Sequence, residues 1–345
     1  MYQRRVQVTG GGTLLVTIPK EWAAEMRVGQ GTTVSLVPTP SGGLLLLPPA
    51  VRERNRCRIT MEGKTSVQLL RDIIAHYIAG FEVIEVVGKR FRPEERRTIR
   101  EIAQSLVGME ILGETHAAVT LGCVADVRDF PVDETIRRIC GITEGMWTDA
   151  LQAFLTRDEE LAQDVIERDG DVDRLVVLVA RQFGLLLRDL LLEQEVGRSR
   201  QEFWHYQSVA DQLERIADHA AKVCRAALAL ALPPFPSFAE RLQGLAKVSL
   251  NVIAEAVRAF EGRDPARANS VLEGKERPEE VWPWVQAAAR EQPENALALS
   301  IAADSLLRIR EHGFNIAEIA LDASVHALPQ SSLKRSAHPQ KEFRG

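Results

Sequence analysis

The sequence predicts a multidomain α+β protein: an N-terminal β module, a small α/β domain, then two tandem antiparallel three-helix bundles. Three observations lead to this prediction. Short β-branched runs separated by glycines fill the first 50 residues, and strand-like and helix-like runs alternate up to residue 130. From there to residue 328 apolar residues recur every three or four positions, which is typical of amphipathic helices.

Composition limits the class of protein. Of the 345 residues, 45% are hydrophobic and 26% are charged, as in soluble proteins with compact cores. No apolar run approaches the roughly 20 residues of a membrane helix, and the N-terminus lacks the apolar core of a secretion signal. The four cysteines lie far apart, which favours reduced thiols. We therefore expect a cytoplasmic protein without membrane insertion.

Charge is distributed unevenly along the chain. Residues 1–60 contain eight Lys or Arg and three Asp or Glu, whereas the remainder contains 35 basic and 45 acidic residues. A basic N-terminal region suggests a polyanionic partner such as DNA. An excess of this size is also common, and half of the basic residues belong to a linker.

The first 50 residues are expected to form two hairpins around a short helix. The strands are predicted at residues 5–8, 14–18, 33–37 and 44–47. Glycines 10–12 supply the first turn, and Pro19 ends the second strand and begins a helix at residues 20–26. So small a module has little core of its own, so it should need a second chain to cover its apolar faces. We therefore expect a homodimer.

This module resembles the swapped-hairpin DNA-binding domain of the AbrB/SpoVT family. The resemblance is carried by Ile18-Pro19-Lys20 at the end of a strand and by Val28-Gly29-Gln30-Gly31 before the next strand. That family binds DNA as an interlaced dimer, so the resemblance implies a dimeric DNA-binding module over residues 1–50. The basic residues that match in kind are Arg4, Arg5 and Lys20, which would contact DNA phosphates. The alternative is that the module only dimerises the chain.

Residues 51–130 follow a boundary of two prolines and an arginine-rich run. Strands are predicted at residues 57–61, 82–87, 109–112 and 117–123, and helices at residues 66–79 and 93–107. This alternation is typical of a small α/β domain. It contains no glycine-rich phosphate loop and no nucleophile motif, so no chemistry is assigned to it.

Six helices are expected after residue 131. They are predicted at residues 132–156, 158–192, 202–230, 237–262, 264–291 and 294–327. Three prolines near residue 234 separate the two sets, so the bundles would cover residues 131–232 and 237–328. The polar tail, residues 329–345, is expected to be disordered.

The two bundles share repeated motifs. Ala-Asp-Gln-Leu-Glu-Arg-Ile-Ala-Asp-His at residues 210–219 returns as Ala-Asp-Ser-Leu-Leu-Arg-Ile-Arg-Glu-His at residues 303–312, and residues 153–167 return as 259–273. These motifs resemble PhoU, a family of phosphate-uptake regulators built from two three-helix bundles. With its N-terminal module, the chain resembles archaeal-type PhoU proteins that carry a fused DNA-binding domain.

The first bundle carries two pairs of carboxylates at helical spacing. Asp169 and Asp173 form one pair, and Glu214 and Asp218 the other, with Asp211 one turn earlier. If their helices are neighbours, these groups converge and repel one another unless a cation neutralises them. Oxygen ligands favour Mg²⁺, Mn²⁺ or a ferric ion, and the resemblance to PhoU implies metal binding at these positions. The alternative is a solvated acidic surface paired with the neighbouring Arg168, Arg174 and Arg215.

The second bundle departs from this pattern. Leu307 and Glu311 stand where Glu214 and Asp218 would be, and Lys275 and Glu279 replace Asp169 and Asp173. We therefore expect a metal ion in the first bundle only. The two motif histidines, His219 and His312, are expected to cap or pack.

The sequence therefore predicts a non-enzymatic regulator of phosphate uptake or phosphate signalling. Its dimeric module would bind DNA, and its helical body would sense metal or phosphate. One alternative is a signalling adaptor that docks on a phosphate ABC transporter or a histidine kinase, with the module serving only to dimerise. Another is a metal-dependent hydrolase that uses the carboxylates, although no nucleophile or positioned base accompanies them.

Overall fold

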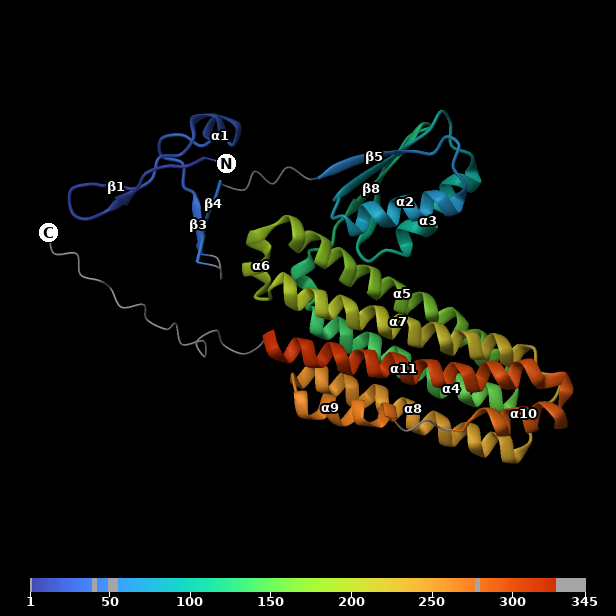
Figure 1. Ribbon diagram of the computed structural model, residues 1–345. Coiled ribbons are helices and arrows are strands. Elements are labelled where there is room, and N and C mark those ends of the chain that lie inside the picture. Colours follow the sequence, from blue (N-terminus) through green and yellow to red (C-terminus); the bar gives the residue numbers. More distant parts are fainter. Residues whose placement is uncertain (1, 39–41, 49–54, 277–279, 327–345) are drawn as a thin grey trace, which may run out of the picture. The chain divides into compact units, whose positions relative to one another are not determined.

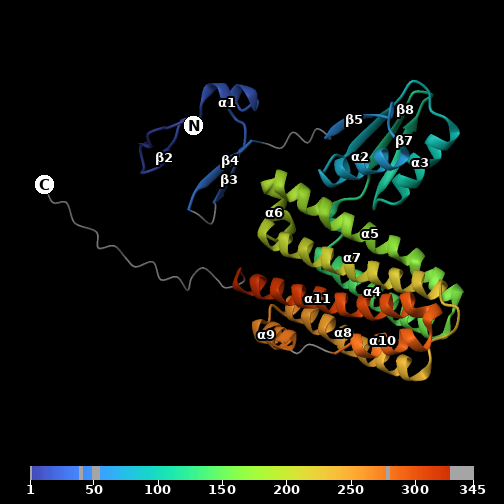
Figure 2. The same ribbon diagram turned by 45° about the vertical axis from the view of Figure 1, so that its right-hand side comes forward.

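The computed structural model describes residues 2–38, 42–48, 55–276 and 280–326. Contacts divide the chain into two compact units, residues 1–54 and 55–345. The tail predicted to be disordered, residues 329–345, lies outside the described residues. The mixed α+β class predicted from the sequence is confirmed, because short strands come first and a body of helices follows (Figures 1 and 2).

The N-terminal unit has two hairpins on either side of one helix. Its elements are β1 (Gln7–Val8), β2 (Leu14–Leu15), α1 (Lys20–Glu25), β3 (Ser35–Pro38) and β4 (Leu44–Leu47). Strands β1 and β2 pair antiparallel, as do β3 and β4. The first two strands are shorter than predicted. None of the described residues of this unit is buried, and Val8 and Leu14 are 70% and 68% exposed. The unit therefore lacks a closed apolar core of its own.

Residues 55–130 fold into a four-stranded sheet with two helices. The elements are β5 (Arg56–Thr60), α2 (Ser66–Ile78), β6 (Val83–Val87), α3 (Pro93–Gln104), β7 (Met109–Glu114) and β8 (Ala118–Cys123). The strand order is β5-β6-β8-β7, with β5 parallel to β6 and the other pairs antiparallel. Helix α2 begins with a capping box, in which Thr65 and Gln68 each accept the other's backbone N–H. Apolar residues of the strands pack with Leu69, Ile73 and Tyr77.

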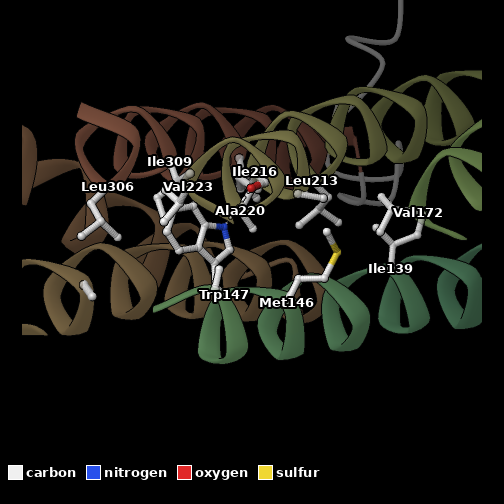
Figure 3. Packing of buried hydrophobic residues seen from close by; sticks show 14 of the residues in the cluster. Ile139, Met146, Trp147, Val172, Leu213, Ile216, Ala220, Val223, Leu306 and Ile309 are labelled. Carbon is white, nitrogen blue, oxygen red and sulfur yellow. Dashed lines mark hydrogen bonds between the residues drawn. The ribbon is translucent and has the colours of Figure 1, made fainter. Parts of the chain in front are cut away.

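The first set of long helices contains α4 (Val132–Thr156), α5 (Glu159–Arg188) and α7 (Arg200–Leu228), with the short α6 (Leu190–Val196) between the last two. The three long helices pack on one another. Trp147 of α4 is fully buried, and its Nε1 donates to the backbone oxygen of Ile216 at 2.8 Å. Figure 3 shows Trp147 and Met146 pointing from α4 toward Leu213 and Ile216 of α7.

The second set contains α8 (Pro236–Gly262), α9 (Pro265–Glu273), α10 (Trp282–Glu291) and α11 (Ala296–His326). The single helix predicted at residues 264–291 is wrong, because α9 ends at Glu273 and α10 begins at Trp282. A continuous helix would place Pro283 in its interior, where proline lacks the N–H and its ring clashes with the preceding turn. The predicted helix at residues 158–192 is also interrupted, since Asp189 has extended backbone (φ −117°, ψ 106°) between α5 and α6.

The repeated Arg-Asp pair of the sequence proves to be a turn between helices. Arg157 and Arg263 end α4 and α8 in the left-handed region, with φ of 59° and 48°. The next residue in each copy caps the following helix: Asp158 accepts the N–H of Leu161 at 3.0 Å, and Asp264 accepts two backbone N–H groups at the start of α9. This part of the repeat therefore serves the fold.

The helical sets share one core, because α7 packs on α11 (Figures 1 and 2). The α/β part joins them through α5. The buried Arg181 of α5 donates to the carbonyl oxygens of Tyr77 and Phe81 at the end of α2. Gly184 allows this close approach, since a Cβ there would lie 2.1 Å from the oxygen of Ile78. No helix within the described ranges has the length and apolarity of a membrane span.

Candidate functional site

The structure brings the two predicted carboxylate pairs together. Asp169 and Asp173 lie on α5, Glu214 and Asp218 lie on α7, and these helices pack on each other. We call these four residues the carboxylate cluster. Partial burial, then repulsion from Asp218 and Asp173, raises the pKa of Glu214 to about 7. The same causes raise the pKa of Asp169 to about 6. Asp173 and Asp218 are therefore each within electrostatic reach of both Glu214 and Asp169.

The fifth predicted residue, Asp211, lies at the edge of the cluster. Its side chain accepts a hydrogen bond from Nε2 of Gln207 at 2.7 Å. Partial burial raises its pKa, and the hydrogen bond from Gln207 partly offsets this. Asp211 makes only the smallest of the contributions to the raised pKa of Glu214. It is thus placed to support the cluster from one side.

Few cations neutralise the carboxylate cluster. The nearest ion pair joins Arg225 and Asp169 at 3.9 Å, which is at the limit of such a contact. Arg168, expected to be a partner on a solvated acidic face, instead bonds to Asp149 and Asp164 at 2.5 and 2.8 Å. The described ion pairs therefore leave much of the cluster's negative charge uncompensated, and its repulsion adds to burial in raising the pKa values of Glu214 and Asp169.

The remaining two arginines of that alternative contribute little. Arg174 is 3.9 Å from Asp171 on its own helix. Arg215 lowers the pKa of Glu214 by less than the repulsive contributions raise it. The alternative of an ordinary surface ion-pair network therefore receives little support from the described ion pairs.

The donor set fits a hard cation. The carboxylate cluster offers only oxygen ligands, and a bound cation would relieve the repulsion that raises the pKa values of Glu214 and Asp169. Across the described ranges, the side chains as positioned form no ready-made group of three or more metal ligands. Binding would therefore require the carboxylates to rotate toward a common point.

The second bundle replaces the cluster with an internal ion pair. Lys275 stands at the position of Asp169 and lies 3.2 Å from Glu318, which stands at the position of Arg225. The acid and the base have exchanged places between the two copies. Leu307 removes a further carboxylate, while Glu279 lies outside the described residues. The second copy thus has at this position a cation of its own.

Sequence reasoning did not foresee how the two motif histidines are arranged. The packing of α7 on α11 places the rings of His219 and His312 6.1 Å apart. Burial lowers the pKa of both, and that of His219 to about 4 with help from Lys222. Their matching positions in the two copies were the available signal, because equivalent residues meet where two repeats pack symmetrically.

The predicted DNA-contacting residues lie on the N-terminal unit. Arg4, Arg5 and Lys20 are all exposed. The guanidinium of Arg4 lies 5.9 Å from the ring centre of Tyr2. Among the described residues, none of the three basic side chains forms an ion pair with an acidic one. All three charges are therefore free to meet phosphates.

Two family models match the chain. The PhoU domain model matches residues 136–227, and the model for the bacterial antitoxin MazE, described as antidote-toxin recognition, matches residues 7–57. The chain therefore combines an N-terminal MazE-type domain with a PhoU domain, and both resemblances found in the sequence are confirmed. The PhoU match lies within the copy that carries the carboxylate cluster.

Curated relatives carry the same family name. A phosphate-specific transport system accessory protein PhoU homolog from Rhizobium meliloti is 28% identical over 207 residues, covering 56% of this chain and 84% of the relative. A protein of that name from Xylella fastidiosa is 25% identical over 181 residues, covering 50% of this chain and 73% of the relative. The crystal structure of PhoU from Pseudomonas aeruginosa is 23% identical with a TM-score of 0.48, covering 58% of this chain and 98% of that one.

Proposed function

We propose that this chain is a PhoU-like accessory regulator of phosphate transport that binds DNA through its N-terminal module and responds to a metal ion or to phosphate status through its helical body. The observation that carries the proposal is the presence of a MazE-type domain and a PhoU domain in one chain. Relatives named as accessory proteins of phosphate transport support the physiological setting. We place the protein in the cytoplasm.

The N-terminal module would act as a homodimer. Many of its apolar side chains are exposed in the single chain, and no described residue of the unit is buried. Leaving so many apolar side chains in water is unfavourable, and a second copy of the module would cover them. Dimerisation would also double the positive charge available to DNA phosphates. This supports a dimeric DNA-binding module.

The carboxylate cluster would hold one hard cation, such as Mg²⁺, Mn²⁺ or a ferric ion. Asp169, Asp173, Glu214 and Asp218 would be its ligands, with Asp211 beside them. The cation would supply the positive charge that the neighbouring arginines do not, and it would tie α5 to α7. A change in metal occupancy would then alter how firmly these helices pack.

Two alternatives remain testable beside this proposal. As an adaptor, the protein would dock on a phosphate transporter or a histidine kinase, and the N-terminal module would only dimerise it. As a metal-dependent hydrolase, it would need a nucleophile or a positioned base beside the cluster. The family relatives are named as accessory proteins, which favours a regulator without catalytic activity.

A gel-shift measurement tests the proposal most directly. The full chain should retard DNA from the promoter of its own gene and of phosphate-transport genes, with a response to phosphate or Mn²⁺. Replacing Arg4, Arg5 and Lys20 by alanine should weaken binding to every sequence and reduce the salt dependence by about one charge per residue.

The control is a variant with equally exposed basic residues replaced outside the module. Lys89, Arg90 and Arg97 are exposed on the α/β part and serve this purpose. Their triple alanine variant should bind DNA as the parent does. If the Arg4/Arg5/Lys20 variant also binds as the parent does, the module is a dimeriser and the adaptor alternative is favoured.

A further inference from the structure

The two motif histidines meet their own counterparts across the repeat. His219 closes the first copy of the motif on α7, and His312 closes the second copy on α11. Their ring centroids are 6.1 Å apart, with the planes inclined by 43°. When equivalent residues of a duplicated motif face each other, the contact has a local two-fold axis that passes between them. We call these residues the histidine pair.

The environment of His312 fixes which ring nitrogen is available. Its Nδ1 lies 2.9 Å from Oε1 of Gln212, and that oxygen also accepts a hydrogen bond from Nδ2 of Asn315 at 3.0 Å. An oxygen of this kind only accepts, so the proton is on Nδ1 and the lone pair is on Nε2. Metal-binding histidines are usually held in this way, with one ring nitrogen donating to an oxygen and the other facing the metal.

The ring of His219 has an unused nitrogen at the same contact. Its Nδ1 is buried and has no hydrogen-bond partner among the described residues. Each repeat therefore contributes one imidazole ring to this contact.

The charged groups that face the rings are balanced in sign. Those that oppose a cation are Lys222, Arg215 and Arg308, and those that favour one are Asp218, Asp304 and Glu311. Asp304 lies on α11, and its two oxygens are 3.8 Å from Nζ of Lys222 and 3.9 Å from Nε of Arg308. An added cation would therefore meet acidic groups on both helices, and Asp304 would exchange two long ion pairs for a ligand bond.

We propose that His219 and His312 together bind one transition-metal ion of the zinc, nickel or cobalt class between α7 and α11, with Asp304 and water completing its coordination. Metal–nitrogen bonds are roughly 2.0–2.1 Å long, so two imidazole centroids that share one ion lie roughly 5–6 Å apart. The observed 6.1 Å lies close to this separation, and side-chain rotation would bring the ligands together, since the described ranges contain no ready-made group of three metal ligands. Imidazole ligands select these metals over Mg²⁺, so this site differs in chemistry from the carboxylate cluster.

Binding of zinc or nickel to the full chain tests the proposal. Calorimetry is performed on an Asp169→Asn/Glu214→Gln background, which removes two ligands of the carboxylate cluster. One ion per chain should bind, and His219→Ala or His312→Ala should each weaken binding by at least about ten-fold, because two ligands are shared across the helices. His116→Ala, at an exposed histidine of the α/β part, should leave binding unchanged.

A second variant separates coordination from packing. Gln212→Leu keeps both ligands but removes the acceptor that orients His312, and it should weaken binding by about ten-fold. The proposal is overturned if the parent background binds no zinc or nickel, or if both histidine variants bind as the parent does.

The unaltered chain offers a measurement that needs no substitution. Diethyl pyrocarbonate modifies unligated imidazole nitrogens, and mass spectrometry locates the modified histidines. Added zinc should protect His219 and His312 while leaving His116 reactive. Equal modification of the pair with and without zinc would contradict the proposal even if the alanine variants fail to fold.

Discussion

Two carboxyl groups, one on α5 and one on α7, have strongly raised pKa values. The pKa of Glu214 lies near 7 and that of Asp169 near 6, because both are partly buried among other acids. At the same positions of the second copy, Lys275 pairs with Glu318 instead. In the first copy the carboxylates repel one another, and a bound cation would relieve that repulsion. In the second copy the ion pair of Lys275 and Glu318 takes its place.

The raised pKa of Glu214 makes stability depend on pH. Between its ordinary value of 4.5 and about 7 the folded chain binds more protons than the unfolded chain, so this group lowers stability as pH rises through that window. With a chelator present, Glu214→Gln should flatten this slope. It should raise the unfolding free energy at pH 8 by less than about 1 kcal/mol, since the half-exposed charge is screened by water.

Urea denaturation of the parent and the variant at pH 5 and pH 8 measures this effect. Glu311→Gln is the matched control, because Glu311 stands in the second copy where Asp218 stands in the first. It should keep the parent's dependence of the unfolding free energy on pH. Equal slopes for the parent and Glu214→Gln would mean that the carboxylate cluster does not repel itself in solution.

Metal content should follow the same residues. Glu214→Ala/Asp218→Ala should lose the ion bound by the parent after loading with Mn²⁺, Mg²⁺ or iron, because each lost carboxylate removes a bond and a neutralising charge. Glu311→Ala should retain it. Elemental analysis of the purified proteins measures the metal content. Equal metal content in the parent and the double variant, or no metal in either, would show that the cluster is only a solvated acidic face.

At the scale of elements, α5 links the two chemically distinct parts of the larger unit. Its first half carries Asp169 and Asp173, and its second half carries Arg181 and Gly184, which hold the end of α2. A change in how α5 packs on α7 would therefore reach the α/β part through a rigid helix. This would give the proposed metal ion a physical route to affect the rest of the chain.

Gly184→Ala should weaken the packing of α2 on α5. The added Cβ would meet the oxygen of Ile78 at 2.1 Å, so the backbones must separate, at a cost of about 1–3 kcal/mol. Gly170→Ala on the same helix meets nothing within 4 Å and should stabilise by up to about 1 kcal/mol. Urea denaturation measures the unfolding free energy of both variants. An unchanged unfolding free energy in Gly184→Ala would argue against tight packing of α2 on α5.

At the scale of the whole molecule, an N-terminal unit without a buried core accompanies a larger unit with a continuous one. The larger unit buries apolar residues from both helical sets in one cluster. The smaller unit leaves residues such as Val8 and Leu14 in contact with water. Its stability is therefore expected to depend on a second copy, whereas the larger unit is expected to fold by itself.

Deleting residues 1–50 should convert the proposed dimer to a soluble monomer, because none of the described residues of that segment is buried. Light scattering of the parent and the deletion variant measures this change. Leu14→Asp, which places a charge at an exposed apolar position of the module, should weaken the dimer in the intact chain. A deletion variant that stays dimeric would show that the helices form the interface.

The sequence by itself determined the order and type of most elements, the duplication and the pairing of carboxylates along each helix. These are local properties, since helical spacing decides which side chains share a face of their own helix. The same local reasoning failed at residues 264–291, where apolar periodicity concealed the break before Pro283. It also treated His219 and His312 as separate packing residues.

Only the tertiary structure decided which faces meet. The approach of Asp173 to Glu214, the exchanged ion pair of Lys275 and the meeting of His219 with His312 all join residues that are far apart in the chain. Such contacts depend on how α5, α7 and α11 pack into one core. Packing is set by the fit of whole helix surfaces, which the spacing of residues along one helix does not contain.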